Sequence, residues 1–94
     1  MKTKEFISKG RKEDSARRLT SIEGQIRGIK KMIQDGRPCV EILTQIAAAQ
    51  EGLKGVGKII MRNYLENCAT TAIRSRAGES IYDELMDVIY KFAR

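Results

Sequence analysis

Apolar residues recur at steps of three and four along three stretches of the chain, and each stretch predicts an amphipathic α-helix. The middle stretch is the longest, and no proline interrupts it between Cys39 and Cys68. Its predicted apolar face comprises Cys39, Leu43, Ile46, Gln50, Leu53, Gly57, Ile60, Tyr64 and Cys68. We expect this helix to continue to about Arg74.

The two cysteines of the chain stand at the two ends of that face. Cys68 follows Cys39 by 29 residues, which is about eight turns at about 100° per residue, so both thiols are expected on one side of the helix. A rise of 1.5 Å per residue separates them by roughly 43 Å, and one straight helix cannot bring them together. Two copies packed antiparallel would place Cys39 of one chain beside Cys68 of the other, twice in a symmetric dimer. The spacing predicts a two-thiol site shared between subunits.

A shorter helix is predicted on each side of the long one. The first begins near Asp14 or Ser15, either of which can cap it, after a basic and loosely ordered arm at residues 1–13. Gly36 ends it, and Pro38 suits the start of the next helix, which puts Cys39 in the opening turn. The apolar faces of the two outer helices comprise Leu19, Ile22, Ile26, Ile29 and Ile33, and then Ile81, Leu85, Val88 and Phe92.

These elements predict an all-α protein, with three helices in the order short–long–short and a single domain across residues 1–94. The first two helices would form an antiparallel hairpin, and two hairpins would close a four-helix bundle. A chain of 94 residues buries a modest core, so association with a second copy is a natural source of further burial.

Charge and composition limit the functions that this chain is expected to have. The net charge of +6 comes entirely from residues 1–37, which suggests a surface that faces phosphate groups. A solvated face with a frayed basic tail is the alternative. The chain has no histidine, and we find no Gly-rich phosphate loop, paired carboxylates or nucleophile elbow, so an enzyme is not expected.

Location affects what the thiols can do. No stretch approaches the ~18 apolar residues of a membrane span, and the N-terminus lacks the apolar core of a signal peptide. We therefore expect a cytoplasmic protein whose thiols are reduced and serve in sensing, catalysis or metal binding. At a helix start the dipole favours a thiolate, so Cys39 is expected to be reactive; the alternative is a buried cysteine that acts as a small apolar residue.

Three segments of the chain, RRLTSIEGQIRGIKKMI, PCVEILTQIAAAQ and NYLENC, resemble the copper-sensitive operon repressors. The resemblance extends from about Ala16 to Phe92. It implies an all-helical dimer of dimers that represses transcription by binding operator DNA, releases the DNA when its cysteine site reacts, and has no enzymatic activity. Relatives within this family sense nickel or cobalt, formaldehyde, or persulfides.

The resemblance also implies roles for particular residues. Cys39 and Cys68 match the two thiols that the family takes from opposite subunits. Arg18 matches a basic residue of the first helix that is implicated in operator contact, and Glu84 matches an acidic residue that lies just outside the site in copper sensors. The residues expected to contact DNA are Arg18 and, after it, Arg17, Lys12 and Lys31.

Three positions depart from the copper sensors. The histidine that stands four residues before their second cysteine is Tyr64 here, and the tyrosine usual before their first cysteine is Pro38. A basic residue in the middle of their second helix is Gly55, although Lys54 and Lys58 are near.

The substitution at position 64 decides the inducer that we predict from the sequence. A phenol with a pKa near ~10 is a poor metal ligand at neutral pH, and nickel, cobalt and zinc sites generally use imidazoles. A bare pair of thiols resembles the persulfide-sensing branch. The prediction is a repressor without cofactor or metal that responds to reactive sulfur species. Cys39 would attack and Cys68 would resolve, with Tyr64 and Glu84 just outside the site.

Three alternatives remain open. The same two thiolates would suit Cu(I), which accepts soft ligands. Formaldehyde sensing in the family pairs the first cysteine with an N-terminal proline amine, and this chain begins Met1-Lys2. In a different class, the chain would be a helical interaction protein that does not bind DNA and whose cysteines are part of its core.

Overall fold

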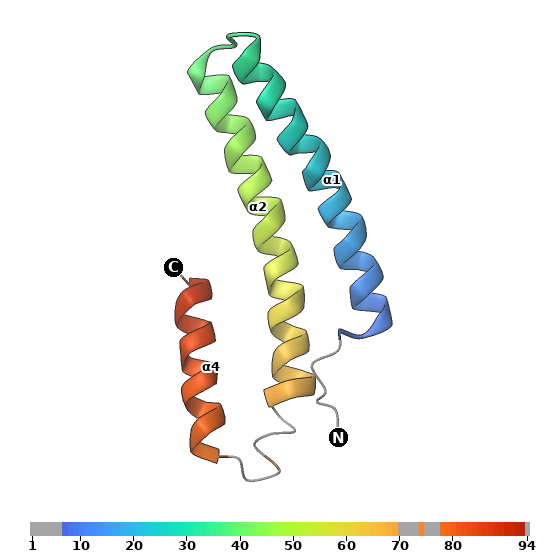
Figure 1. Ribbon diagram of the computed structural model, residues 1–94, viewed down its shortest axis with the longest axis vertical. Helices are drawn as coiled ribbons and strands as arrows, with labels where there is room; N and C mark the ends of the chain where they lie inside the picture. Colours follow the sequence, from blue (N-terminus) through green and yellow to red (C-terminus); the bar gives the residue numbers. More distant parts are fainter. Residues whose placement is uncertain (1–6, 70–73, 75–77, 94) are drawn as a thin grey trace.

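The computed structural model describes the backbone of residues 7–69, 74 and 78–93, and the side chains of these residues except 68, 69, 78–81 and 93. Helices α1 (Lys9–Gln34) and α2 (Cys39–Asn63) form an antiparallel hairpin, and a π-helical turn, η1 (Tyr64–Ala69), continues α2 (Figure 1). Helix α4 (Gly78–Ala93) returns alongside the second half of α2. The described residues contain no strand, and the predicted all-α fold of three helices is confirmed. No helix among them is long and apolar enough to cross a membrane.

Helix α1 begins at Lys9, five residues before the predicted start at Asp14, and with 26 residues it is not shorter than the 25-residue α2. Ser8 precedes it without a capping bond from its side chain. Instead, the backbone N–H of Ser8 donates to Asn63 Oδ1 at the end of α2 (3.1 Å). A contact across the hairpin therefore fixes the start of α1, and residues 9–13 of the predicted loose arm are helical.

The turn between α1 and α2 closes as the sequence predicts. Gly36 has a φ angle of +72°, which glycine adopts without the steric cost that a Cβ would add. The N–H groups of Gly36 and Arg37 bond back to carbonyl oxygens in the last turn of α1 (3.2 and 3.0 Å), the paired bonds of a Schellman motif. Pro38 is the N-cap of α2. Cys39 is therefore the first residue of α2, in the opening turn.

Helices α1 and α2 bury little apolar surface within one chain. Among the described side chains, Ile22 and Val56 are the buried apolar ones, 7% and 6% exposed. Ile22 packs on Gly52, where an added Cβ would lie 3.4 Å from Ile22 Cδ1. The chain is 15 Å deep along its shortest axis, little more than one helix with its side chains at about 10–12 Å. Much of the predicted apolar faces is consequently exposed, including Leu19, Ile26, Ile33, Leu43 and Leu53.

Helix α4 lies against the second half of α2 along an open apolar groove of about 630 Å³. The groove is lined by Leu53, Val56, Gly57, Ile60, Met61, Tyr64, Val88, Lys91 and Phe92. The Phe92 ring comes so close to α2 that a Cβ added at Gly57 would lie 2.6 Å from Phe92 Cζ. Gly57 therefore permits the close approach of α4. Val88 and Phe92 of the third predicted apolar face are at this contact; the side chain of Ile81 lies outside the described residues.

Candidate functional site

Cys39 is a free, exposed thiol at the tip of the hairpin, in the opening turn of α2 (Figure 1). Beside it, Arg37 and Glu41 form an ion pair across one helical turn. Within one chain Cys39 is not a core residue, so its thiol is open to a metal ion, a sulfur species or a second subunit.

Cys68 lies in η1, where the helix changes from α to π geometry. The regular α-helix expected to run to about Arg74 ends at Asn63. A π-helix bonds residues five apart, so the rotation of about 100° per residue used to place both thiols on one face holds up to Asn63 and not beyond. The side chain of Cys68 lies outside the described residues, and the shared face stays a prediction. Single π turns inside helices frequently mark functional sites.

The two cysteines belong to opposite ends of the rod formed by α2 and η1. Helix α2 alone has 25 residues, which is roughly 38 Å at 1.5 Å per residue. One chain therefore cannot bring Cys39 and Cys68 onto one ion or into one disulfide. The described residues also contain no cluster of three or more His, Cys, Asp or Glu side chains that could hold a metal ion. A site that uses both thiols requires two chains.

Tyr64 and Glu84, the two residues predicted to lie just outside the site, are in contact. Tyr64 Oη donates a hydrogen bond to Glu84 Oε2 at 3.1 Å. Tyr64 is the first residue of η1, and Glu84 is in the second turn of α4. The bond therefore ties the segment that carries Cys68 to the last helix.

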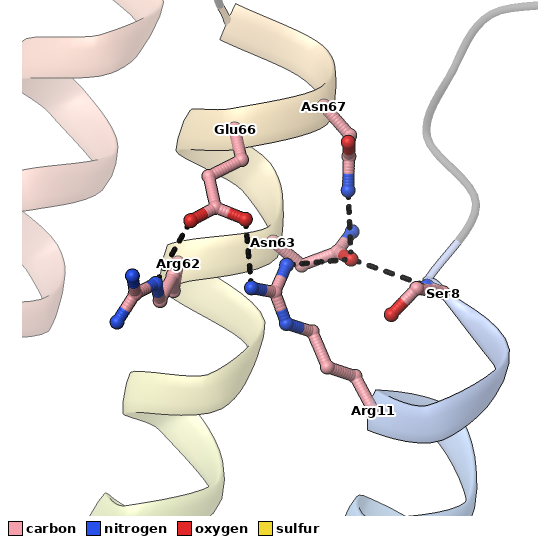
Figure 2. Close-up of polar contacts among 6 residues, drawn as sticks. All are labelled: Ser8, Arg11, Arg62, Asn63, Glu66 and Asn67. Carbon is pink, nitrogen blue, oxygen red and sulfur yellow. Dashed lines mark hydrogen bonds and ion pairs between the residues drawn. The ribbon is translucent and has the colours of Figure 1, made fainter.

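A polar cluster at the junction of α2 and η1 was not predicted from the sequence (Figure 2). Its centre is Asn63, which is 2% exposed. Asn63 Oδ1 accepts hydrogen bonds from the Ser8 backbone N–H (3.1 Å), Arg11 Nη1 (3.3 Å) and Asn67 Nδ2 (3.0 Å). The cluster therefore joins the start of α1 to the segment that leads into Cys68.

Glu66 extends this cluster toward the solvent. Its Oε1 accepts from Arg11 Nη2 (2.7 Å) and its Oε2 accepts from Arg62 Nε (2.8 Å), as Figure 2 shows. The hydrogen bond from Arg62, followed by that from Arg11, lowers the pKa of the Glu66 carboxyl. The same bond to Glu66 raises the pKa of Arg62. The spacing of Arg62 and Glu66 by four residues was a visible signal in the sequence, whereas Arg11 reaches Glu66 across 55 residues.

The four residues expected to contact DNA all lie on α1 and are exposed: Lys12, Arg17, Arg18 and Lys31. Asp14 Oδ1 accepts from Arg17 Nη2 (3.1 Å) and Arg18 Nε (3.0 Å), so one carboxylate orients both guanidinium groups. A Cβ added at Gly55 would lie 3.9 Å from Arg18 Nη1. Arg18 therefore lies over the position where the family resemblance expects a basic residue. Contact of these residues with DNA stays a prediction.

Comparisons with known proteins agree with this architecture. A sequence model described as metal-sensitive transcriptional repressor matches residues 11–91. The chain is 40% identical over 93 residues to the copper-sensing transcriptional repressor CsoR of Bacillus subtilis (strain 168), which covers 99% of this chain and 92% of that protein. It is 31% identical over 87 residues to CsoR of Mycobacterium tuberculosis (strain ATCC 25618 / H37Rv), covering 93% and 71%.

Two solved structures are also similar. The copper-sensing repressor CsoR from Geobacillus thermodenitrificans NG80-2, solved with Cu(I), has a TM-score of 0.83 and 44% identity, covering 93% of this chain and 91% of that chain. The nickel-responsive transcriptional regulator InrS has a TM-score of 0.72 and 36% identity, covering 85% and 90%.

These comparisons correct one prediction. The sequence led us to expect a site without cofactor or metal, because histidine is absent and Tyr64 stands at the third ligand position. The CsoR proteins that it resembles are copper-sensing, one of them was solved with Cu(I), and InrS is nickel-responsive. The prediction of no cofactor is therefore wrong, and the absence of histidine has to be explained in another way.

Proposed function

This chain belongs to the family of metal-sensitive transcriptional repressors, and we propose that it binds operator DNA and releases it when Cu(I) binds to Cys39 and Cys68. The chain is a transcriptional repressor and not an enzyme. That Cu(I) is the inducer and that these thiols are its ligands is inferred from the ligand atoms that the chain can offer to a metal ion. A cytoplasmic location belongs to the same proposal.

One observation carries the proposal: an exposed thiol at the start of α2, in a chain 44% identical to a copper-sensing repressor solved with Cu(I). Soft thiolates suit Cu(I), whereas zinc and nickel are commonly bound by imidazoles. Since the chain has no histidine at all, its residues fit a site made of two sulfur ligands. When bound, Cu(I) would supply the link between them.

Such a site needs two subunits. Antiparallel packing of two α2–η1 rods would place Cys39 of one chain near Cys68 of the other and create two equal sites in a symmetric dimer. The exposed apolar residues of the hairpin support this packing, since Leu43 is 62% and Leu53 is 54% exposed in the single chain. Exposed apolar surface of this kind marks interaction sites.

Release of DNA requires that Cu(I) bind more tightly to the form of the protein that does not fit the operator. A ligand shifts an equilibrium only by its difference in affinity for the two states. The basic residues on α1 would lose their match to the phosphates when the bundle adopts its Cu(I)-bound geometry. We therefore expect Cu(I) to weaken operator binding, and DNA to weaken Cu(I) binding by the same factor.

Sensing of persulfides is the second candidate, and one contact favours it. Tyr64, at the position of the copper sensors' histidine, donates its hydroxyl to Glu84. A pair of thiols without a third ligand is what a polysulfide needs for cross-linking Cys39 to Cys68 of another chain. One thiolate breaks an S–S bond of the polysulfide, which leaves a persulfide on that cysteine and releases a polysulfide one sulfur shorter; the other thiolate then attacks the inner sulfur of the persulfide, expels hydrosulfide and forms the disulfide.

A side-by-side release experiment decides between the two inducers. The metal-free protein is bound to a duplex selected from a random-sequence library, and either Cu(I) under anaerobic conditions or sodium tetrasulfide is added. The proposal predicts release by one Cu(I) per chain, and no Cu(I)-dependent release in Cys39→Ser or Cys68→Ser. Release by tetrasulfide, with a mass increase on intact chains and no response to Cu(I), would replace it with the second candidate.

A further inference from the structure

The polar cluster of Figure 2 joins the two parts of the chain that the proposed function has to connect. One part is the first turn of α1, which leads into the basic residues expected to contact DNA. The other is η1, which carries Cys68. On the basis of the proposed function, we propose that Arg11, Asn63 and Glu66 are positioning residues that transmit the state of the Cys68 segment to the DNA-facing start of α1.

Asn63 makes this junction sensitive to movement. It is the most buried of the described residues at 2% exposure, and its Oδ1 accepts from Arg11 of α1 and from Asn67 of η1. A buried polar atom that loses its partners is costly. The start of α1 therefore cannot move away from the end of α2 without breaking these bonds or taking Asn63 with it.

Arg11 connects the two segments with one rigid group. Its Nη1 donates a hydrogen bond to Asn63, the last residue of α2, and its Nη2 donates one to Glu66 within η1. The planar fork holds both bonds in one fixed geometry. A displacement of η1 on ligand binding therefore changes the position of Arg11, and Lys12 follows it directly in the chain.

Glu66 and Asn67 place this junction next to the sensing thiol. Asn67 immediately precedes Cys68 and donates to Asn63. Glu66 is held by Arg62 from α2 as well as by Arg11 from α1. The π turn that contains both residues departs from regular helix geometry, and such turns are frequently found at functional sites.

The test measures operator affinity with and without Cu(I) for wild-type protein, Glu66→Gln and Arg11→Lys. Glu66→Gln keeps the shape of the side chain and removes its charge, while Arg11→Lys keeps the charge and removes the fork. Asp87→Asn is the matched control, because it also removes an acidic group from an exposed ion pair, that with Lys91 on α4 (3.3 Å). Cu(I) affinity of the free protein is measured by competition with bathocuproine disulfonate.

We expect both cluster variants to bind Cu(I) as the wild type does. The factor by which Cu(I) weakens operator binding should be at least about fivefold smaller in these variants than in the wild type, which is within the range of typical coupling between sites. Asp87→Asn should respond as the wild type. If the wild type and the cluster variants respond equally to Cu(I), this inference alone is overturned. A wild type whose operator affinity does not change with Cu(I) overturns the proposed function and this inference with it.

Discussion

Tyr64 donates its hydroxyl to Glu84 Oε2 at 3.1 Å, and the two residues are 20 positions apart in the chain. The bond connects η1 with α4, four residues before Cys68. This contact supports a role for Tyr64 in holding the segment that leads to Cys68, one of the two proposed ligands. It also gives Glu84 a partner at the place where the resemblance predicts an acidic residue just outside the site.

Removal of the hydroxyl in Tyr64→Phe tests that role. We expect the free energy of unfolding to fall by about 0.5–1.5 kcal/mol, the usual contribution of one hydrogen bond, while the stoichiometry of Cu(I) binding stays unchanged. Urea unfolding and anaerobic Cu(I) titration measure the two quantities. Tyr82→Phe is the control, because this tyrosine of α4 is 51% exposed. Loss of Cu(I) binding in Tyr64→Phe would contradict this expectation and show that the site needs the hydroxyl.

Two glycines of α2 make a matched pair for the packing of α4. A Cβ at Gly57 meets the Phe92 ring, whereas the nearest atom to a Cβ at Gly55 is Arg18 Nη1 at 3.9 Å. Alanine gains up to about 1 kcal/mol over glycine inside a helix, but overpacking costs about 1–3 kcal/mol. Gly55→Ala is therefore expected to be about 1–3 kcal/mol more stable than Gly57→Ala in urea unfolding.

Equal stability of the two alanine variants would mean that the Phe92 ring moves away without loss of packing. The double variant Gly57→Ala with Phe92→Leu separates the two effects. The smaller side chain at position 92 should restore part of the lost free energy of unfolding if the clash with the ring is the cause.

The hairpin was predictable because its signals are local. The steps of three and four in the apolar pattern predicted helices, and the glycine followed by proline at positions 36 and 38 predicted their boundary. The Schellman motif at Gly36 depends on residues within one turn of each other. Cys39 at the start of α2 follows from the same local chemistry.

The parts that the sequence analysis missed depend on long-range contacts. Helix α1 begins at Lys9 because the N–H of Ser8 meets Asn63, 55 residues away. The change to π geometry at Tyr64 breaks a pattern that regular periodicity assumes. The pairing of Arg11 with Glu66 likewise has no signal in the spacing of residues along one helix.

Charge reversal at Arg18 tests the surface of α1 that is predicted to contact DNA. Arg18→Glu is expected to weaken operator binding, and for each lost phosphate contact the negative slope of log affinity against log salt should become less steep by about 0.9. Cu(I) binding by the free protein should not change, because Arg18 is on α1 and pairs with Asp14. Lys91→Glu on α4 makes the same change of charge elsewhere and is the control. Operator binding that is equal in both variants would show that the assignment of Arg18 is wrong.

The proposed site, shared between two subunits, makes a prediction that a site within one chain does not. Cys39→Ser and Cys68→Ser each destroy both sites of a homodimer, because every site takes one thiol from each chain. In a mixed dimer, however, the chain that keeps Cys39 faces the chain that keeps Cys68, and one complete site returns. Equal amounts of the two variants, after exchange of subunits, should therefore recover about a quarter of the wild-type Cu(I) capacity.

The measurement is tight Cu(I) binding against bathocuproine disulfonate, before and after mixing. The control is a mixture of Cys39→Ser with the double variant Cys39→Ser and Cys68→Ser, in which no dimer contains a complete site. Recovery in the first mixture with none in the control follows from the length of α2, since roughly 38 Å of helix keeps the two thiols of one chain apart. Tight binding by either single variant before mixing would show that one thiol is sufficient, and no recovery after proven exchange would show that the rods do not lie antiparallel.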